Sequence, residues 1–260
     1  MSNTLTASPA PATTATSKDD LGIDRAFILQ MSQIPFLAVL FVAINFAAHT
    51  IWSAVSPQTH NLAPVLVISA GMILAAIIDG WAFKVPNWLT LSLVVSGWLL
   101  GILHDCGVAV DAGHGGFAYS LLGTAVGFFL LFPILFIGGM GQGDVKMQMG
   151  FGAWLGAFFG AGLDAFGGHD ALMILLYAFC SGTIVGGVFG LVMMTLRRAF
   201  ASNAKNFREI FLDLRVLLTQ GPKKAAERAN SRRPSWVRLP YGVPLCVGFL
   251  GTLAYLHWVS

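Results

Sequence analysis

Hydrophobic positions in this chain gather in seven long runs, and polar positions separate the runs. A helix needs about 20 predominantly apolar residues to cross the hydrocarbon core of a bilayer. The runs have about this length, so the pattern predicts an all-α fold, a polytopic membrane helix bundle of about seven transmembrane helices. The predicted spans are Ile34–Trp52, Pro64–Phe83, Trp88–Cys106, Phe117–Ile137, Val145–Leu163, Ala171–Leu196 and Pro240–Trp258.

Composition supports a membrane protein, because 56% of the residues are hydrophobic and only 10% are charged. Soluble domains are about half apolar and a quarter charged. Residues 1–26 are rich in Ser, Thr, Ala and Pro and lack an apolar core, which predicts a disordered cytoplasmic tail rather than a secretory signal. We expect residues 27–63 to form an extra N-terminal transmembrane helix with an outer loop, and residues 64–260 to form a six-helix membrane core.

Positive charge predicts the orientation of the bundle. With seven spans, all basic residues before, between and after them fall on one side, which the positive-inside rule makes cytoplasmic. The N-terminus is then cytoplasmic and the C-terminus exported, in an inner (plasma) membrane protein. These basic residues are Lys18, Arg25, Lys84, Lys146 and eleven of the chain's fifteen Lys and Arg between Arg197 and Arg238.

The basic stretch at residues 197–238 has a helical pattern of its own. Apolar residues recur at spacings of three and four, which predicts an amphipathic cytoplasmic helix on the anionic inner leaflet. They are Phe207, Ile210, Phe211, Leu214, Leu217 and Leu218. The stretch lacks any nucleic-acid-binding motif, so we expect no nucleic acid partner.

Two carboxylates fall at the predicted cytoplasmic edge. Asp79 ends the second span in "AAIIDGWAF", and Asp144 opens the fifth in "GQGDVKM". Either aspartate alone is more often a solvated helix end. A bundle that brought them together would form an acid pair in which one carboxylate retains a proton, suited to both taking and giving a proton.

Short motifs surround both aspartates. Gly141 and Gly143 permit a positive φ or the close approach of another chain before Asp144. After Asp79, Pro86 cannot continue a helix and Asn87 is a plausible N-cap of the third span. Lys146 either supports Asp144 or contacts a substrate, or it only marks a cytoplasmic helix start.

These residues resemble the type IV prepilin peptidase family. The resemblance consists of an aspartate followed seven residues later by Pro-Asn (Asp79, Pro86, Asn87), a Gly-x-Gly-Asp-Val-Lys segment (Gly141 to Lys146), "GFGAWLG", and "LPYGVPLCVG" at the last span. It implies a membrane aspartic endopeptidase with catalytic Asp79 and Asp144. Such an enzyme removes the short basic leader of prepilins or pseudopilins at the cytoplasmic face, and works beside pilus or secretion machinery.

This chain differs from the larger members of that family, whose Cys-x-x-Cys pairs are thought to bind zinc and which also methylate the new N-terminus. Cys106, Cys180 and Cys246 are isolated. We therefore expect no metal, no cofactor and no methyltransferase activity.

Other functions remain open. A presenilin-like intramembrane aspartyl protease shares the GxGD segment, but it typically has Tyr-Asp where this chain has Ile78-Asp79. A proton-coupled transporter would place its carboxylates near the midplane, in interrupted helices. A catalytically inactive assembly subunit is disfavoured by the presence of both acids.

Overall fold

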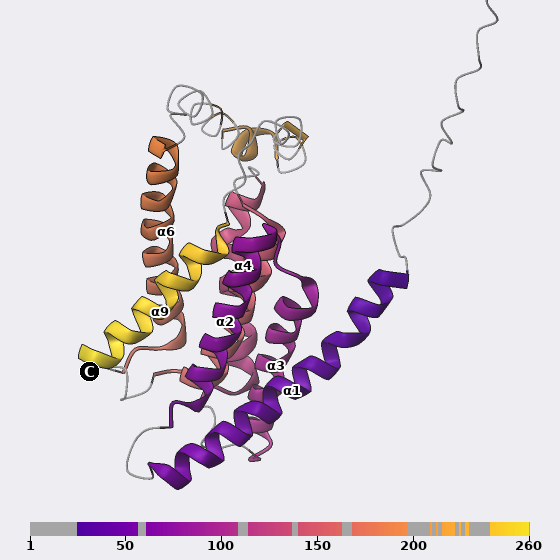
Figure 1. Cartoon of the computed structure of the whole chain (residues 1–260), viewed down its shortest axis with the longest axis vertical. Coiled ribbons are helices and arrows are strands. Elements are labelled where there is room, and N and C mark those ends of the chain that lie inside the picture. Colours follow the sequence, from indigo (N-terminus) through magenta and orange to yellow (C-terminus); the bar gives the residue numbers. More distant parts are fainter. Residues whose placement is uncertain are drawn as a thin grey trace, which may run out of the picture.

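The fold was taken from a computed structural model that describes residues 25–56, 61–108, 114–136, 140–162, 168–196 and 240–259, and a few positions between 209 and 228. Seven long helices account for most of these residues, and no strand occurs in these ranges. The predicted all-α bundle is thereby confirmed (Figure 1). The helices are α1 (Arg25–Val55), α2 (Ala63–Ala82), α3 (Asn87–Asp105), α4 (Gly116–Phe136), α5 (Gln142–Phe159), α6 (Ala171–Leu196) and α9 (Gly242–Val259).

Six of the seven helices are long and apolar enough to cross a membrane, which makes the chain a multi-pass membrane protein. The exception is α5, where the sequence predicted a span at Val145–Leu163. All but four of the eighteen residues of α5 are buried inside the protein. A helix that is enclosed by other helices need not present an apolar surface to lipid. Its lower hydropathy therefore reflects its central position.

Glycines hold α5 against α4. A Cβ atom on Gly152 would lie 2.0 Å from the carbonyl oxygen of Gly123, and one on Gly156 would lie 2.1 Å from that of Tyr119. The two backbones therefore touch directly. The hydroxyl of Ser120 adds a hydrogen bond to the carbonyl oxygen of Ala153, at 2.9 Å. Helix α5 is therefore closely packed against α4.

A tryptophan fixes α5 against α3 on its other side. The indole nitrogen of Trp154 donates to the carbonyl oxygen of Leu93 at 3.0 Å and to the hydroxyl of Ser96 at 2.9 Å. Trp154 is only 1% exposed, so both bonds are protected from water. Buried side-chain hydrogen bonds of this kind specify one arrangement of neighbouring helices.

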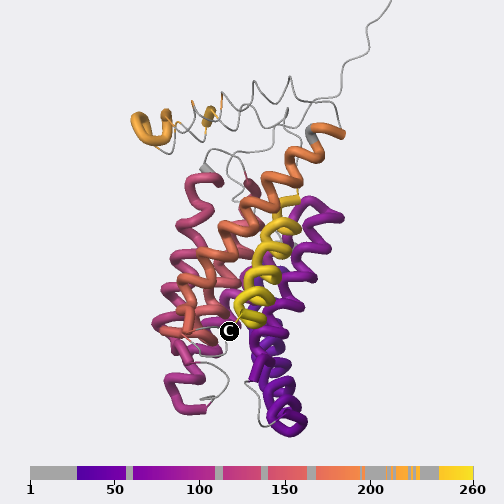
Figure 2. The backbone as a smooth tube through the Cα atoms, turned by 90° about the vertical axis from the view of Figure 1, so that its left-hand side faces the viewer, coloured from indigo at the N-terminus to yellow at the C-terminus, as the bar shows by residue number. Residues whose placement is uncertain are grey.

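The last helix, α9, packs chiefly on α6, and these two helices lie side by side in both views (Figures 1 and 2). A Cβ atom on Gly248 would lie 2.1 Å from the backbone nitrogen of Gly182, so the helices cross backbone to backbone. The hydroxyl of Ser181 donates to the carbonyl oxygen of Gly248 at 2.8 Å. Phe249 stacks on Phe151 of α5, with ring centroids 5.1 Å apart.

The N-terminal helix α1 lies obliquely across the bundle and packs mainly on α3 and α2 (Figure 1). It begins at Arg25, earlier than the predicted span at Ile34. Ala38, Val42 and Asn45 face the bundle, whereas Phe36 and Val39 are exposed. Residues 1–24, which carry most of the predicted disordered tail, lie outside the described residues.

Most of the predicted amphipathic segment, residues 197–238, also lies outside the described residues. Residues 215–220 within it are helical, as the pattern predicts for this short part. In this part Leu217 is half-buried and Leu218 is exposed.

Candidate active site

Asp79 lies in the last turn of α2 and is 5% exposed. Its backbone carbonyl accepts a hydrogen bond from the N–H of Phe83, a residue with φ of 50° that ends the helix. One side-chain oxygen, Oδ2, accepts the backbone N–H of Gly242 at 2.8 Å.

Asp144 is the third residue of α5 and is also 5% exposed. Its Oδ2 accepts the backbone N–H of Gly141, the residue just before the helix, at 3.2 Å. A carboxylate at this position is stabilised by the unpaired N–H groups of the first helical turn. Its Oδ1 is buried and has no hydrogen-bond partner within the described ranges.

The two aspartates lie at the same end of the bundle, with Asp79 in the last turn of α2, beside the start of α9, and Asp144 in the first turn of α5. They interact electrostatically, because the charge of Asp79 acts on the carboxyl group of Asp144. One oxygen of each acid accepts a glycine N–H, and Oδ1 of Asp144 is buried without a donor among the described residues. Paired carboxylates of this kind disfavour the doubly charged state and can exchange a proton with a bound group.

The connection between α2 and α3 lies against the glycines before Asp144. A Cβ atom on Gly143 would lie 3.2 Å from the Cβ atom of Val85 and 3.3 Å from its backbone nitrogen. Val85 itself is 3% exposed. The segment that approaches Gly143 is the α2–α3 connection of the same chain, and the predicted approach of another chain stays a prediction. Neither Gly141 nor Gly143 has a positive φ.

Lys146 ties the start of α5 to the start of α3. Its Nζ donates to the side-chain oxygen of Asn87 at 2.8 Å. Within the described residues, Lys146 forms no ion pair with Asp144. The prediction that Asn87 is an N-cap is wrong, because Pro86, with φ of −72° and ψ of 143°, takes the cap position and Asn87 is the first helical residue. The side chain of Asn87 instead accepts the hydrogen bond from Lys146 and so joins α3 to α5.

Two further residues beside the acids are Gly242 and Tyr241. Tyr241 precedes α9, and burial, with a smaller contribution from the negative charge of Asp144, raises the pKa of its phenol. Gly242 contacts Asp79 across 163 positions of sequence through its backbone N–H. Both stand in the "LPYGVPLCVG" segment, which was quoted only for its resemblance. Because the donor is a backbone N–H group, no side chain in the sequence indicated that position 242 would bind Asp79.

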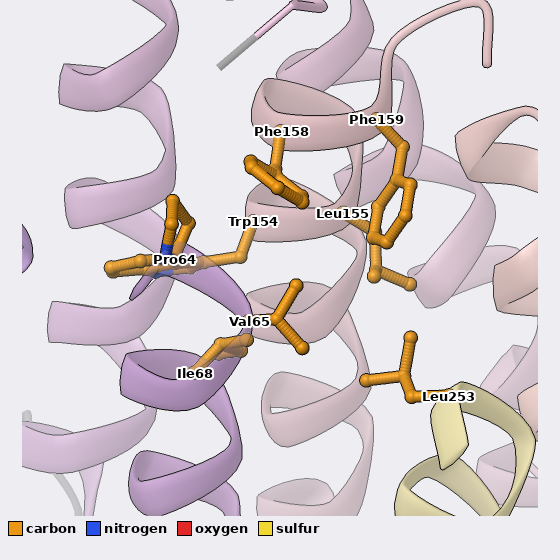
Figure 3. A pocket seen from close by; sticks show the side chains of 8 residues that line it. All are labelled: Pro64, Val65, Ile68, Trp154, Leu155, Phe158, Phe159 and Leu253. Atoms are coloured by element: carbon orange, nitrogen blue, oxygen red, sulfur yellow. The ribbon is translucent and has the colours of Figure 1, made fainter. Parts of the chain in front are cut away.

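The apolar crevice in Figure 3 lies elsewhere. It is lined by side chains of α2, α5 and α9 around Pro64, Trp154 and Leu253. Pro64 is separated from Asp79 by 15 positions on α2, or about 22 Å at 1.5 Å per residue. Among the described residues, no group of three or more His, Cys, Asp or Glu residues could hold a metal ion.

Residues 66–190 match the model of the type IV leader peptidase family. This segment contains both aspartates and extends from the first turn of α2 into α6. It ends before α9. No curated protein and no solved structure matches the chain.

Proposed function

Since residues 66–190 make this chain a member of the type IV leader peptidase family, we propose that it is an aspartic endopeptidase with catalytic Asp79 and Asp144. Family membership indicates a membrane protease that acts on prepilins. The aspartic mechanism and the two catalytic residues are the new elements of the proposal.

The observation that carries the proposal is the matched state of the two acids. Both are 5% exposed, one oxygen of each accepts a glycine N–H, and Oδ1 of Asp144 is buried without a hydrogen-bond partner among the described residues. A structural carboxylate at a helix end is normally fully hydrogen-bonded or solvated. Two buried, mutually interacting carboxylates at one end of a bundle, one of them with a buried oxygen that has no donor among the described residues, support a pair that shares a proton and activates water.

The reaction follows from this pair. The ionised carboxylate takes a proton from the water as its oxygen attacks the carbonyl carbon of the scissile peptide. The protonated carboxyl group gives its proton to the carbonyl oxygen, forming a tetrahedral intermediate. When the C–N bond breaks, the newly protonated carboxyl group gives its proton to the leaving amine. The other carboxylate takes a proton back from a hydroxyl group of the intermediate, which becomes the product carboxyl group, and the pair returns to its starting state.

The surrounding residues support the acids. Gly143 allows the Val85 backbone to approach α5, and the hydrogen bond from Lys146 to Asn87 holds the start of α3 beside it. Pro86 ends the connection from α2 in an extended conformation. These contacts fix the distance between the helices that carry the acids, which is what proton transfer through one water requires.

The location of the site suits a prepilin substrate. With the orientation inferred from positive charge, the acids lie at the cytoplasmic face of the plasma membrane, where a soluble basic leader meets an apolar helix in the bilayer. The enzyme would then cut just before that helix. The isolated cysteines give no zinc site, so the proposed enzyme does not methylate its product.

The test is co-expression with a prepilin precursor from the same genome, followed by mass spectrometry of the mature N-terminus. Asp79→Asn and Asp144→Asn should each leave the precursor uncut. Asp105→Asn is the matched control. Asp105 is exposed at the end of α3 opposite Asn87, and its carboxylate accepts the N–H of Phe117 at 3.0 Å.

Cleavage by the wild type and by Asp105→Asn, lost in both other variants, would establish the acid pair. Cleavage that survives Asp79→Asn or Asp144→Asn would remove that residue from the mechanism. A methyl group on the mature N-terminus would contradict the expected absence of methyltransferase activity.

A further inference from the structure

The contact between Gly242 and Asp79 joins the candidate site to a helix that the family match does not include. The match ends at residue 190, whereas α9 begins at Gly242. The peptidase chemistry proposed above names only the two acids. The contact therefore makes the start of α9 a part of the candidate site.

Asp79 stands at the unfavourable end of its own helix. A negative charge in the last turn of α2 faces the negative end of the helix dipole and the carbonyl groups that have no partner there. The first N–H of α9 compensates, because helix N-termini carry unpaired donors and partial positive charge. Gly242 is the first residue of α9, and its N–H reaches Oδ2 of Asp79 at 2.8 Å.

Only glycine allows this approach. A Cβ atom at position 242 would lie 2.8 Å from Oδ2 of Asp79, 3.0 Å from its Cβ and 3.1 Å from its Cγ. A real side chain there must displace either the carboxylate or the start of α9. Because Gly242 is buried, the displaced groups have no open space to enter.

The rest of α9 keeps this donor in place. The backbone crossing at Gly248 and Gly182 and the hydrogen bond from Ser181 fix α9 on α6. The stacking of Phe249 on Phe151 fixes it on α5, the helix of the second acid. The N–H of Gly242 thus has a defined position relative to both carboxylates, unlike a donor in a loose loop.

We propose that the start of α9 is a positioning element of the acid pair, in which the backbone N–H of Gly242 orients the Asp79 carboxylate and favours its ionised form. Gly242 acts through Asp79 and does not itself touch the substrate. This inference depends on the proposed peptidase function. It adds a third helix, from outside residues 66–190, to the machinery of the site.

The test compares Gly242→Ala with Gly251→Ala. Gly251 lies in the same helix, and a Cβ atom there would meet nothing within 4 Å. The readout is the pH profile of kcat/KM for cleavage of a purified prepilin precursor in detergent micelles. A variant that only reduces the amount of folded enzyme scales the whole profile and leaves its limbs at the same pH.

For Gly242→Ala we expect kcat/KM to fall on the order of 10- to 100-fold, the effect of misplacing a catalytic group by up to about 1 Å. The acid limb should also move to higher pH, because a carboxylate that loses its hydrogen-bond donor is harder to ionise. Gly251→Ala should match the wild type in both respects.

A second variant perturbs the contact without altering either partner. A Cβ atom on Gly80 would lie 3.5 Å from Cγ2 of Val243, an ordinary contact. Gly80→Ala should therefore be neutral. Gly80→Val adds methyl groups that press on Val243, and it should shift the acid limb in the same direction as Gly242→Ala.

The outcomes separate the two proposals. A wild-type profile in both Gly242→Ala and Gly80→Val would overturn the role of α9, even if the Asp→Asn variants are inactive. Cleavage that persists in Asp79→Asn would instead refute the peptidase mechanism itself. If Gly242→Ala does not fold, the profile of Gly80→Val against Gly80→Ala decides alone.

Discussion

Gly143→Ala is the substitution that tests the packing of the site most directly, since it adds one methyl group between the two segments beside the acids. The new Cβ atom would lie 3.2 Å from the Cβ atom of Val85, 3.3 Å from its nitrogen and 3.4 Å from its carbonyl oxygen. Such contacts are tighter than normal, so one segment must move by a few tenths of an ångström. Val85 is 3% exposed and cannot swing into solvent.

The size of the effect follows from that displacement. Misplacing a catalytic group by 1 Å costs about 100-fold in rate, so a few tenths of an ångström should cost about 3- to 10-fold. Gly143→Val places further methyl groups against the same backbone and should reduce the rate by about 100-fold or more. In both variants kcat should fall, because the contact of Gly143 with Val85 sets the spacing of the reacting groups.

The assay is the initial rate of prepilin cleavage in micelles, alongside thermal unfolding of each variant. Gly190→Ala in α6 is the control, since a Cβ atom there meets nothing within 4 Å and alanine is favoured over glycine in helices by about 1 kcal/mol. A wild-type rate in Gly143→Val would show that the Val85 segment does not set the geometry of the site.

Three other predictions address the bundle and its electrostatics. Gly152→Ala should destabilise the protein by about 3 kcal/mol or more, because its Cβ atom would lie 2.0 Å from a backbone oxygen of α4. Gly187→Ala is the control, since a Cβ atom there has open space around it and should not destabilise the protein. Thermal unfolding in micelles distinguishes the two variants. Trp154→Phe should lower the free energy of unfolding by about 1 to 3 kcal/mol in denaturant titration, since two buried hydrogen bonds from the indole nitrogen are lost. Asp144→Asn should lower the pKa of Tyr241 relative to the wild type in a tyrosinate absorbance titration, because a negative neighbour opposes phenolate formation. The pKa should still stay above its ordinary value of 10.0, since the phenol remains buried. An unchanged pKa would contradict the electrostatic contact between Asp144 and Tyr241.

The sequence was most informative where a side chain carries the chemistry. Asp79 and Asp144 were identified because carboxylates are rare in apolar runs, and both were expected at the same membrane edge. The structure brings them to one end of the bundle. Hydropathy also predicted the helices, since the length of an apolar run is a strong signal.

The sequence failed where the decisive group belongs to the backbone or to a distant partner. Gly242 contributes an N–H, which every residue except proline has. Asn87 was expected to cap α3 because that is its usual local role. Its side chain instead accepts a hydrogen bond from Lys146, 59 positions away. The enclosure of α5 likewise depends on which helices surround it, and no single run of residues shows that.

These failures share a physical origin in the small residues that enclose the site. A polar helix can lie inside a membrane bundle only if protein replaces lipid on all sides, and in α5 the glycines at 152 and 156 let α4 approach to backbone contact. The same device operates at Gly143 and Gly242, where the missing side chain lets a neighbouring backbone or carboxylate enter. Burying two carboxylates would be unfavourable without donors, and the donors here are backbone N–H groups exposed by glycine. Close helix packing and the chemistry of the acid pair are therefore one requirement, and a methyl group added at any of these glycines should affect both.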